Sequence, residues 1–314
     1  MQIDKIKIIE SSSEAGAGTR GASLGSKALQ LAALKIMPDF FTPFEKVAVE
    51  QLNHEIEQTN NLPNARNAAQ VLFAAQKLAV AVESGLENAN DLLILTGDHS
   101  NAAGSVSGFS NHFGAENIGV VWIDAHADLH SPYTTPSGNM HGMPLAALLG
   151  KDNLKVQQQN PKEKTLAIWE SLKTLGSKKD MPKLLTKNLV FIGIRDLEQQ
   201  EWDFIAEYGI KYFGPSEIET MGIEAVCDET KRYLSNSPYW YVSFDADSID
   251  PNISSGTGTP VPLGLSESEV LHCFKTFFKE PRVHAFEITE INPLLDTENK
   301  MAEFLLANLA TVLK

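Results

Sequence analysis

The 314-residue sequence contains only two cysteines, Cys227 and Cys273, and neither lies near another ligand type at the spacing of a zinc site. This scarcity excludes disulfide scaffolds, so we expect two ordinary buried thiols in a reducing compartment. Basic residues are also few, because 26 Lys and Arg stand against 40 Asp and Glu, for a formal net charge of −14. That charge argues against a nucleic-acid or anionic-membrane partner.

Long apolar runs are missing as well. Residues 1–9 carry charges inside their apolar run, unlike a secretory signal, and no stretch approaches the roughly 20 residues of a membrane span. We therefore expect a cytoplasmic protein. The composition, 43% hydrophobic and 21% charged, is typical of a globular protein with a full core. Without an internal repeat or a linker, we predict a single domain over residues 1–314.

Short apolar, β-branched runs alternate with helical patterns along the chain. We predict strands at residues 5–9, 46–52, 91–95, 119–123, 189–194, 209–213, 239–244 and 283–288. We predict helices at residues 27–36 with Ser26 as N-cap, 65–86, 143–149, 166–175, 266–279 and 301–313, one starting near 104, and one on each side of strand 209–213, up to residue 234. Residues 151–187 are rich in Lys, Gln and Asn and are expected to be an exposed excursion. The alternation predicts an α/β domain with a mainly parallel sheet.

The most informative stretch is the apolar run 119–123 and the polar residues that follow it. Asp124, His126 and Asp128 stand at alternate positions, and in an extended backbone such side chains share one face. Parallel α/β sheets place their ligand sites at this carboxyl end of a strand. Taken alone, the pattern is equally typical of a strand that ends in a solvated turn.

Three other predicted strands also end in candidate ligands. His99 follows residues 92–95, Asp245 and Asp247 follow 241–244, and Glu290 follows 283–288. Singly, these residues could cap a helix, form a turn or be exposed, but four such strand ends on one edge are improbable by chance. Two histidines and four aspartates suit two divalent cations, and their oxygen-rich mix favours Mn²⁺ over a structural zinc.

These segments resemble the ureohydrolase family, and within it the arginases. The resemblance rests on Gly97-Asp-His-Ser100, Trp122-Ile-Asp-Ala-His-Ala-Asp128, Ser137-Gly-Asn-Met-His-Gly142, Ser243-Phe-Asp-Ala-Asp-Ser-Ile-Asp-Pro251 and Glu290-Ile-Asn-Pro293. It implies a three-layer α/β/α fold, a pair of Mn²⁺ ions about a bridging hydroxide, and a homotrimer or homohexamer. By position, the implied metal ligands are His99, Asp124, His126, Asp128, Asp245 and Asp247.

The same resemblance implies roles for residues around the metals. Glu290 corresponds to the acid that binds the guanidinium, His141 to a proton-shuttling histidine, and Asp128 to a ligand that also relays a proton. The implied substrate contacts are His130, Thr135, Ser137 and Asn139 for the carboxylate, Glu198 and Glu201 for the α-amino group, and Thr259 beside the second aspartate pair. The chain departs from the arginase pattern at His130, typically Asn, and at Glu198, usually Asp.

The resemblance predicts hydrolysis of L-arginine to L-ornithine and urea. An imidazole at His130 can donate to the substrate carboxylate but is bulkier than Asn, which predicts weaker affinity for arginine. Agmatine, another guanidino compound and formiminoglutamate remain alternative substrates for the same metal site. A non-catalytic, metal-stabilised assembly protein is a further alternative, although it would have no use for Glu290 and His141 together.

Overall fold

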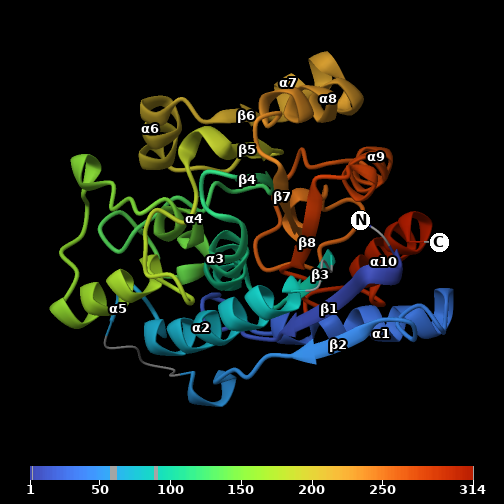
Figure 1. The fold of residues 1–314 in the computed structure, drawn as a ribbon, viewed down its shortest axis with the longest axis horizontal. Helices are drawn as coiled ribbons and strands as arrows, with labels where there is room; N and C mark the ends of the chain where they lie inside the picture. Colours follow the sequence, from blue (N-terminus) through green and yellow to red (C-terminus); the bar gives the residue numbers. More distant parts are fainter. Residues whose placement is uncertain (2, 57–61, 88–90, 314) are drawn as a thin grey trace.

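The computed structural model describes residues 1, 3–56, 62–87 and 91–313. Its centre is an eight-stranded sheet in which every neighbouring pair is parallel, in the order β2-β1-β3-β8-β7-β4-β5-β6 (Figure 1). The strands are β1 Ile6–Ser11, β2 Glu45–Ala48, β3 Asp91–Thr96, β4 Ile118–Ile123, β5 Leu189–Ile192, β6 Lys211–Phe213, β7 Tyr239–Asp245 and β8 Val283–Thr289. The mainly parallel sheet expected from the sequence is thus confirmed.

Helices cover both faces of this sheet. They are α1 Gly25–Ile36, α2 Ala68–Gly85, α3 Ala102–Phe113, α4 Pro144–Leu148, α5 Glu163–Lys173, α6 Gln199–Tyr208, α7 Pro215–Met221, α8 Ile223–Tyr233, α9 Glu267–Lys279 and α10 Lys300–Val312. One face packs against α1, α8, α9 and α10, and the other against α2, α3, α4 and α6. The three-layer α/β/α architecture is therefore also confirmed.

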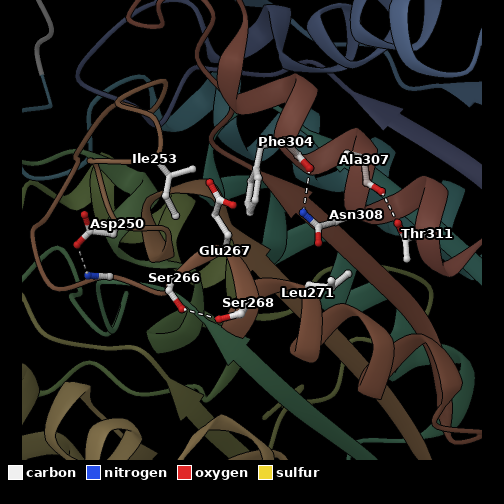
Figure 2. A pocket seen from close by; sticks show the side chains of 11 residues that line it. Asp250, Ile253, Ser266, Glu267, Ser268, Leu271, Phe304, Ala307, Asn308 and Thr311 are labelled. Carbon is white, nitrogen blue, oxygen red and sulfur yellow. Dashed lines mark hydrogen bonds between the residues drawn. The ribbon is translucent and has the colours of Figure 1, made fainter.

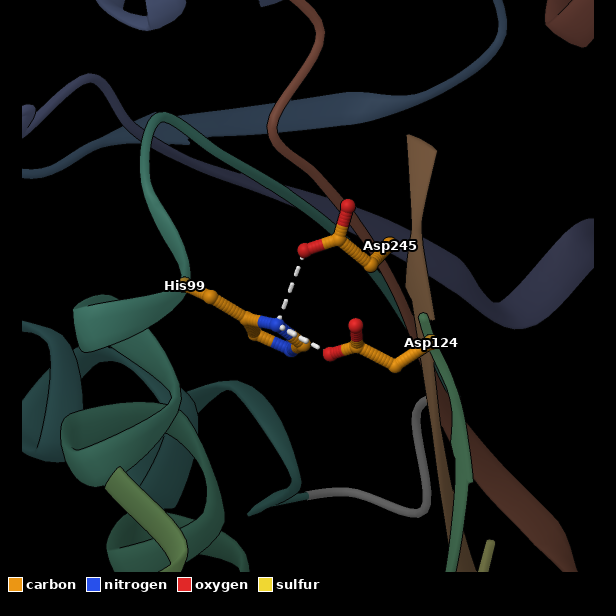
Figure 3. A group of neighbouring side chains, drawn as sticks. All are labelled: His99, Asp124 and Asp245. Carbon is orange, nitrogen blue, oxygen red and sulfur yellow. Dashed lines mark ion pairs between the residues drawn. The ribbon is translucent and has the colours of Figure 1, made fainter. Parts of the chain in front are cut away.

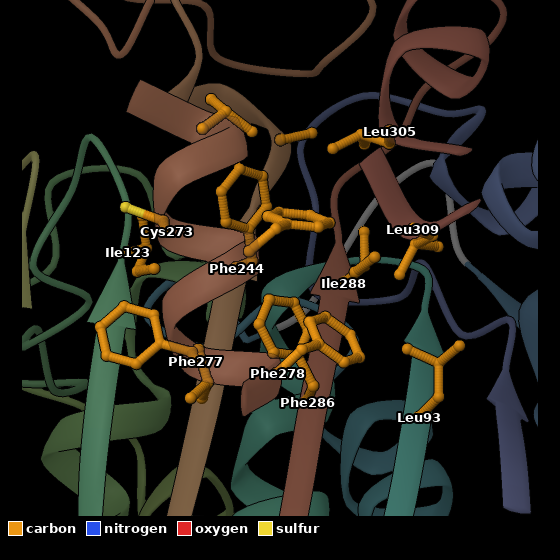
Figure 4. Close-up of a cluster of buried hydrophobic side chains, with 14 of the residues drawn as sticks. Leu93, Ile123, Phe244, Cys273, Phe277, Phe278, Phe286, Ile288, Leu305 and Leu309 are labelled. Carbon is orange, nitrogen blue, oxygen red and sulfur yellow. The ribbon is translucent and has the colours of Figure 1, made fainter. Parts of the chain in front are cut away.

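The alternation of side chains along each strand explains why both faces need helices. Leu93 belongs to one core and its neighbours Leu92 and Ile94 to the other. Aromatic rings fill the first core between α9 and the sheet, where Phe278 and Phe286 stack with ring centroids 4.4 Å apart (Figure 4). Such two-sided burial requires the nearly continuous apolar strands that the sequence shows.

The first predicted helix begins differently from the expectation. Ser26 was expected as its N-cap, but α1 begins at Gly25 with Leu24 as the N-cap residue. The Ser26 side chain lies inside the helix, and its hydroxyl oxygen is buried without a hydrogen-bond partner. The prediction was wrong because a short helical turn, Ala22–Leu24, leads directly into the helix. No free helix end is left for a serine cap.

The polar segment 151–187 is less exposed than predicted. Trp169 and Leu172 of α5 are buried in an apolar cluster that also includes residues of α2. Lys183 is only 1% exposed, and its ammonium group donates to Asn111 Oδ1 on α3 at 2.8 Å. The prediction of an exposed excursion was therefore wrong for these residues, because the helix predicted in this segment packs one apolar face against α2 and Lys183 is bonded to α3.

Two expectations about composition have structural counterparts. Cys227 and Cys273 are fully buried free thiols with their sulfur atoms 4.0 Å apart, as expected. Among the described residues, no helix is both long and apolar enough to cross a membrane.

The sheet order explains how the candidate site is assembled. The strands β3, β8, β7 and β4 are consecutive neighbours at the centre of the sheet. Asp124 and Glu290 directly follow β4 and β8, Asp245 is the last residue of β7, and His99 lies shortly after the end of β3. Parallel pairing places all four ends on one edge, so segments up to about 190 residues apart in sequence meet there.

Candidate metal centre and substrate pocket

The first group of ligand atoms surrounds His99. Its Nδ1 atom lies 3.0 Å from Asp124 Oδ2 and 3.0 Å from Asp245 Oδ2 (Figure 3). Asp128 Oδ2 lies 3.2 Å from the same atom. All four side chains are buried. Burial opposes a charged imidazole, but the nearby carboxylates outweigh it and raise the pKa of His99 well above its ordinary value. A positive charge at the centre therefore stabilises this group of ligand atoms.

The contacts of the other ring nitrogen of His99 indicate that a metal ion, not a protonated imidazole, supplies this positive charge. Ser243 Oγ donates to Glu287 Oε2 at 2.9 Å and lies 2.8 Å from His99 Nε2. The serine oxygen is therefore free to accept the Nε2 proton, which leaves the Nδ1 lone pair facing the carboxylates. His99 Nδ1 and Asp128 Oδ2 are both buried without a hydrogen-bond partner. Unpaired atoms of this kind fit a divalent cation.

A second group of ligand atoms shares one carboxylate with the first. Asp124, His126 and Asp247 each offer one ligand atom within 4.8 Å of the others. His126 Nδ1 lies 3.0 Å from Asp247 Oδ2 and 3.6 Å from Asp124 Oδ1. Burial disfavours a charged His126, yet Asp247 and Asp124 together raise its pKa above the ordinary value. Because Asp124 belongs to both groups, it can bridge two adjacent cations.

Nearby side chains fix the orientation of these ligands. The Trp122 indole N–H donates to Asp124 Oδ2 at 2.9 Å, and its ring stacks on His99 at a centroid distance of 4.1 Å. The Thr259 hydroxyl donates to Asp247 Oδ2 at 2.9 Å. Thr259 was expected among the substrate contacts, and here its hydroxyl contacts a candidate metal ligand. Contacts of this kind tune both ligand geometry and metal affinity.

Glu290 and His141 form a pair beside the first group. Glu290 Oε1 accepts a hydrogen bond from His99 N at 3.0 Å and lies 3.0 Å from His141 Nδ1. Burial opposes the charged form of each residue. Their mutual interaction outweighs it, raising the pKa of His141 to about 9 and lowering that of Glu290. Glu290 is only 2% exposed, which excludes the alternative of an exposed acid.

Two of the site residues adopt left-handed backbone conformations. Asp128 has φ 52° and Glu290 has φ 61°. For residues other than glycine this conformation costs free energy and concentrates at functional sites. Glu290 directly follows β8, and Asp128 lies in the loop that follows β4, so the local strain accompanies the turns that hold these two carboxylates.

A cavity of about 110 Å³ lies over the ligand groups. Its lining includes the predicted residues His99, His126, Asp128, His130, Thr135, Ser137, Asn139, His141, Glu198, Glu201, Asp245, Asp247 and Thr259. Asp124 and Glu290 lie behind this lining. The structure thus brings together, in or directly beside one cavity, every residue expected from the sequence to contact metal or substrate.

Two hydroxyl groups in the lining of the cavity are arranged as donors. Thr135 Oγ1 accepts from Gly138 N at 2.9 Å, and Ser137 Oγ accepts from Asn139 N at 3.1 Å. Each hydroxyl proton is therefore available to a ligand. These two hydroxyl donors suit a carboxylate group.

Two glutamates and a histidine also line the cavity. His130 Nε2 lies 2.9 Å from Glu198 Oε2 and 3.5 Å from Glu201 Oε2. The hydrogen bond from His130 lowers the pKa of Glu198 to about 2, whereas burial raises that of Glu201 to about 8. The two positions at which the chain departs from the arginase pattern are therefore in direct contact.

Sequence analysis missed several residues that hold the site together. Glu287 is fully buried in β8 and accepts from Ser243, from Thr96 at 3.1 Å and from Ser105 at 3.3 Å. Asp98 accepts backbone hydrogen bonds across the loop at residues 16–17. An acid inside an otherwise apolar strand was the available signal for Glu287. Asp98 was recognised only as a possible helix cap, which it also is.

Arg195 is another residue that the motifs did not single out. Its guanidinium donates to the carbonyl oxygens of Gly193 at 2.9 Å, Asp247 at 2.8 Å, Val261 at 2.8 Å and Pro262 at 2.9 Å. It thereby ties the ligand-bearing loop after β7 to the segment that follows Thr259. No local pattern predicts such long-range carbonyl contacts.

A larger cavity of about 900 Å³ lies elsewhere, between α9, α10 and the loop that contains Asp250 (Figure 2). Its lining mixes apolar side chains such as Ile253, Leu271 and Phe304 with hydroxyl and amide groups. None of the candidate metal groups found among the described residues belongs to it. Cavity size alone is thus a poor guide to the chemistry of this chain.

Comparison with known proteins places these features in a family. The model of the Arginase family matches residues 5–313. An arginase from Staphylococcus aureus (strain COL) is 35% identical over 303 residues, covering 95% of this chain and 93% of the relative. The crystal structure of arginase from Bacillus subtilis subsp. subtilis str. 168 superposes with a TM-score of 0.83 at 32% identity, covering 98% of each chain. The arginase of Entamoeba histolytica, in complex with L-ornithine, gives a TM-score of 0.84 at 26% identity, covering 100% of this chain and 99% of that one.

Proposed function

The chain belongs to the arginase family of ureohydrolase enzymes, and on this premise we propose that it hydrolyses L-arginine to L-ornithine and urea. The observation that carries the proposal is the position of the cavity. Its lining combines members of two ligand groups that share Asp124 with the hydroxyl groups of Thr135 and Ser137 and the carboxylate of Glu198. A long substrate with a guanidinium at one end and an α-amino acid at the other could contact both kinds of lining group.

The residues proposed to hold two cations are the six from the sequence: His99, Asp124, His126, Asp128, Asp245 and Asp247. The unpaired Nδ1 of His99 and Oδ2 of Asp128 support this assignment. Four carboxylates and two imidazoles without a thiolate favour Mn²⁺. When bound, two such cations supply Lewis-acid chemistry and lower the pKa of water, so that hydroxide is available near neutral pH.

Glu290 is the residue proposed to orient the guanidinium. Its buried carboxylate keeps a lowered pKa through His141, so it stays ionised. One oxygen, Oε1, is used by His99 N and His141, and the other can accept N–H groups of the substrate. A charge-assisted contact of this kind would hold the planar group at a fixed angle to the metal centre.

Asp128 and His141 are proposed to move protons. Asp128 is one of the proposed metal ligands, and a carboxylate oxygen that it does not use for a metal could take up a proton. That oxygen could then deliver the proton to the leaving amine. His141 lines the same cavity, with its side chain 20% exposed, and could exchange protons with solvent.

The amino-acid end of the substrate would meet Thr135, Ser137 and Asn139 through its carboxylate, and Glu198 and Glu201 through its ammonium group. Agmatine lacks the carboxylate and would leave the two hydroxyl donors unused. Formiminoglutamate would place a second carboxylate, not an ammonium group, near the glutamates. These mismatches make both compounds weaker candidates.

Release of urea from L-arginine tests the proposal. Protein loaded with Mn²⁺ should produce urea and L-ornithine in equal amounts, and chelated protein should produce neither. Absence of urea from the loaded protein would reject the proposed reaction.

A further inference from the structure

His130 lines the substrate cavity, yet both of its ring nitrogens are bonded to the protein. Nδ1 lies 3.1 Å from Thr134 Oγ1, and Nε2 lies 2.9 Å from Glu198 Oε2. Thr134 Oγ1 also accepts from Ser131 N at 3.0 Å, which fixes the hydroxyl beside the ring. The imidazole is thus held in one orientation, and neither nitrogen is left for a substrate carboxylate.

Glu198 is the partner that can meet a ligand. It is the N-cap residue of α6, and its side chain is 50% exposed where it lines the cavity. A carboxylate accepts up to about four hydrogen bonds, so the contact with His130 leaves acceptor sites available. Glu201 stands behind it, accepting from Leu129 N at 3.1 Å and from Glu198 N at 3.2 Å.

A half-exposed glutamate samples several rotamers unless other groups hold it. The residues that line this cavity in the described part of the chain include no Lys or Arg, so His130 is the basic side chain positioned to hold Glu198, in addition to the capping-box contact between Glu198 and Glu201. Ordering a flexible side chain when a ligand binds reduces affinity. A side chain already fixed in the free protein avoids that loss.

We propose that His130 is a positioning residue that makes the pocket selective for guanidino α-amino acids, because it fixes Glu198 where the α-ammonium group binds. The inference rests on the proposed function and adds that the α-ammonium group is the feature of the substrate that these residues recognise. On the sequence alone, the imidazole was expected to contact the substrate carboxylate and to weaken the affinity for arginine, and the inference assigns it the opposite effect on affinity. Thr135 and Ser137 remain the contacts for the carboxylate.

The test compares L-arginine with 5-guanidinopentanoate, which keeps the chain and the carboxylate but lacks the α-amino group. The measured quantity is the ratio of their kcat/KM values in Mn²⁺-loaded protein. Three variants are compared with the natural protein. His130→Asn is too short to reach Glu198, His130→Gln restores an N–H at similar reach, and Asp203→Asn removes an exposed carboxylate of α6 outside the cavity.

The natural protein should favour L-arginine by about 100-fold or more. His130→Asn should lower this ratio about 10-fold, which corresponds to about 1.4 kcal/mol, mainly through KM for L-arginine. His130→Gln should retain most of the ratio, and Asp203→Asn all of it. An unchanged or higher ratio in His130→Asn, or a His130→Gln ratio as low as that of Asn, would overturn the inference.

Binding of product analogues gives a readout that does not depend on turnover. L-Ornithine and 5-aminopentanoate differ only by the α-amino group, and calorimetry on the same proteins gives the ratio of their Kd values. His130→Asn should reduce the preference for L-ornithine by a similar factor, and an equal preference in both proteins would contradict the inference. Failure of the natural protein to release urea from L-arginine would instead reject the proposed function, and the inference with it.

Discussion

The Ser243 hydroxyl lies 2.8 Å from His99 Nε2 and donates to the buried Glu287 carboxylate, so a strand residue sets the proton position on a candidate metal ligand. Removing that hydroxyl should free the imidazole to rotate or to change its tautomer. We expect Ser243→Ala to weaken binding of one Mn²⁺ by about 10- to 100-fold, measured by titration of metal-free protein.

Ser107→Ala is the matched control for this change. Ser107 is also fully buried, but its hydroxyl oxygen has no hydrogen-bond partner and belongs to neither ligand group. Its loss should leave the metal affinity unaltered. Equal affinities in Ser243→Ala and the natural protein would mean that the serine does not orient His99.

Asp247 belongs to only one of the two ligand groups, whereas Asp124 belongs to both. Asp247→Ala should therefore retain about one metal ion per chain, and Asp124→Ala should retain less. Activity should fall by several orders of magnitude in both variants because both ligands set the position of the attacking oxygen. Elemental analysis after dialysis measures the stoichiometry, and two ions retained by both variants would contradict the shared-ligand assignment.

His141 is proposed to transfer protons without binding metal. We expect His141→Ala to lower kcat by roughly 100-fold, with the metal content unchanged. The comparison requires equal Mn²⁺ loading and a full pH profile. A kcat that matches the natural protein at every pH would assign the residue a structural role.

The pH dependence of stability follows from the His141–Glu290 contact. The pKa of His141 is raised from 6.5 to about 9 in the folded state, chiefly by Glu290 against the opposing effect of burial. The folded protein therefore holds a proton that the unfolded chain releases above pH 6.5, and the stabilisation disappears as the pH rises through 9.

In metal-free protein, the free energy of unfolding should fall with pH between 6.5 and 9, and His141→Asn should flatten that slope. Each unit of pKa shift corresponds to about 1.4 kcal/mol. Urea denaturation at several pH values measures the difference between the two proteins. Parallel curves would show that His141 carries no raised pKa in the metal-free state.

The residues predicted from the sequence lie together in the structure because strand ends and candidate ligands are coupled in this fold. A buried parallel strand must be apolar, so the first acids and imidazoles after it mark the sheet edge, as at Asp124 and Asp245. Contacts between residues far apart in the sequence leave no comparable pattern in it. Glu287 was hidden inside a strand, Arg195 binds carbonyl groups that no sequence pattern specifies, and the His130–Glu198 contact joins residues 68 apart.

The central claim is that this metal site acts on L-arginine. The most direct measurement is kcat/KM for L-arginine, agmatine and formiminoglutamate with the same Mn²⁺-loaded protein. The account predicts the highest value for L-arginine, because that substrate alone presents both a carboxylate to Thr135 and Ser137 and an ammonium group to Glu198. A higher value for agmatine or formiminoglutamate would contradict the L-arginine assignment and leave only membership of the family.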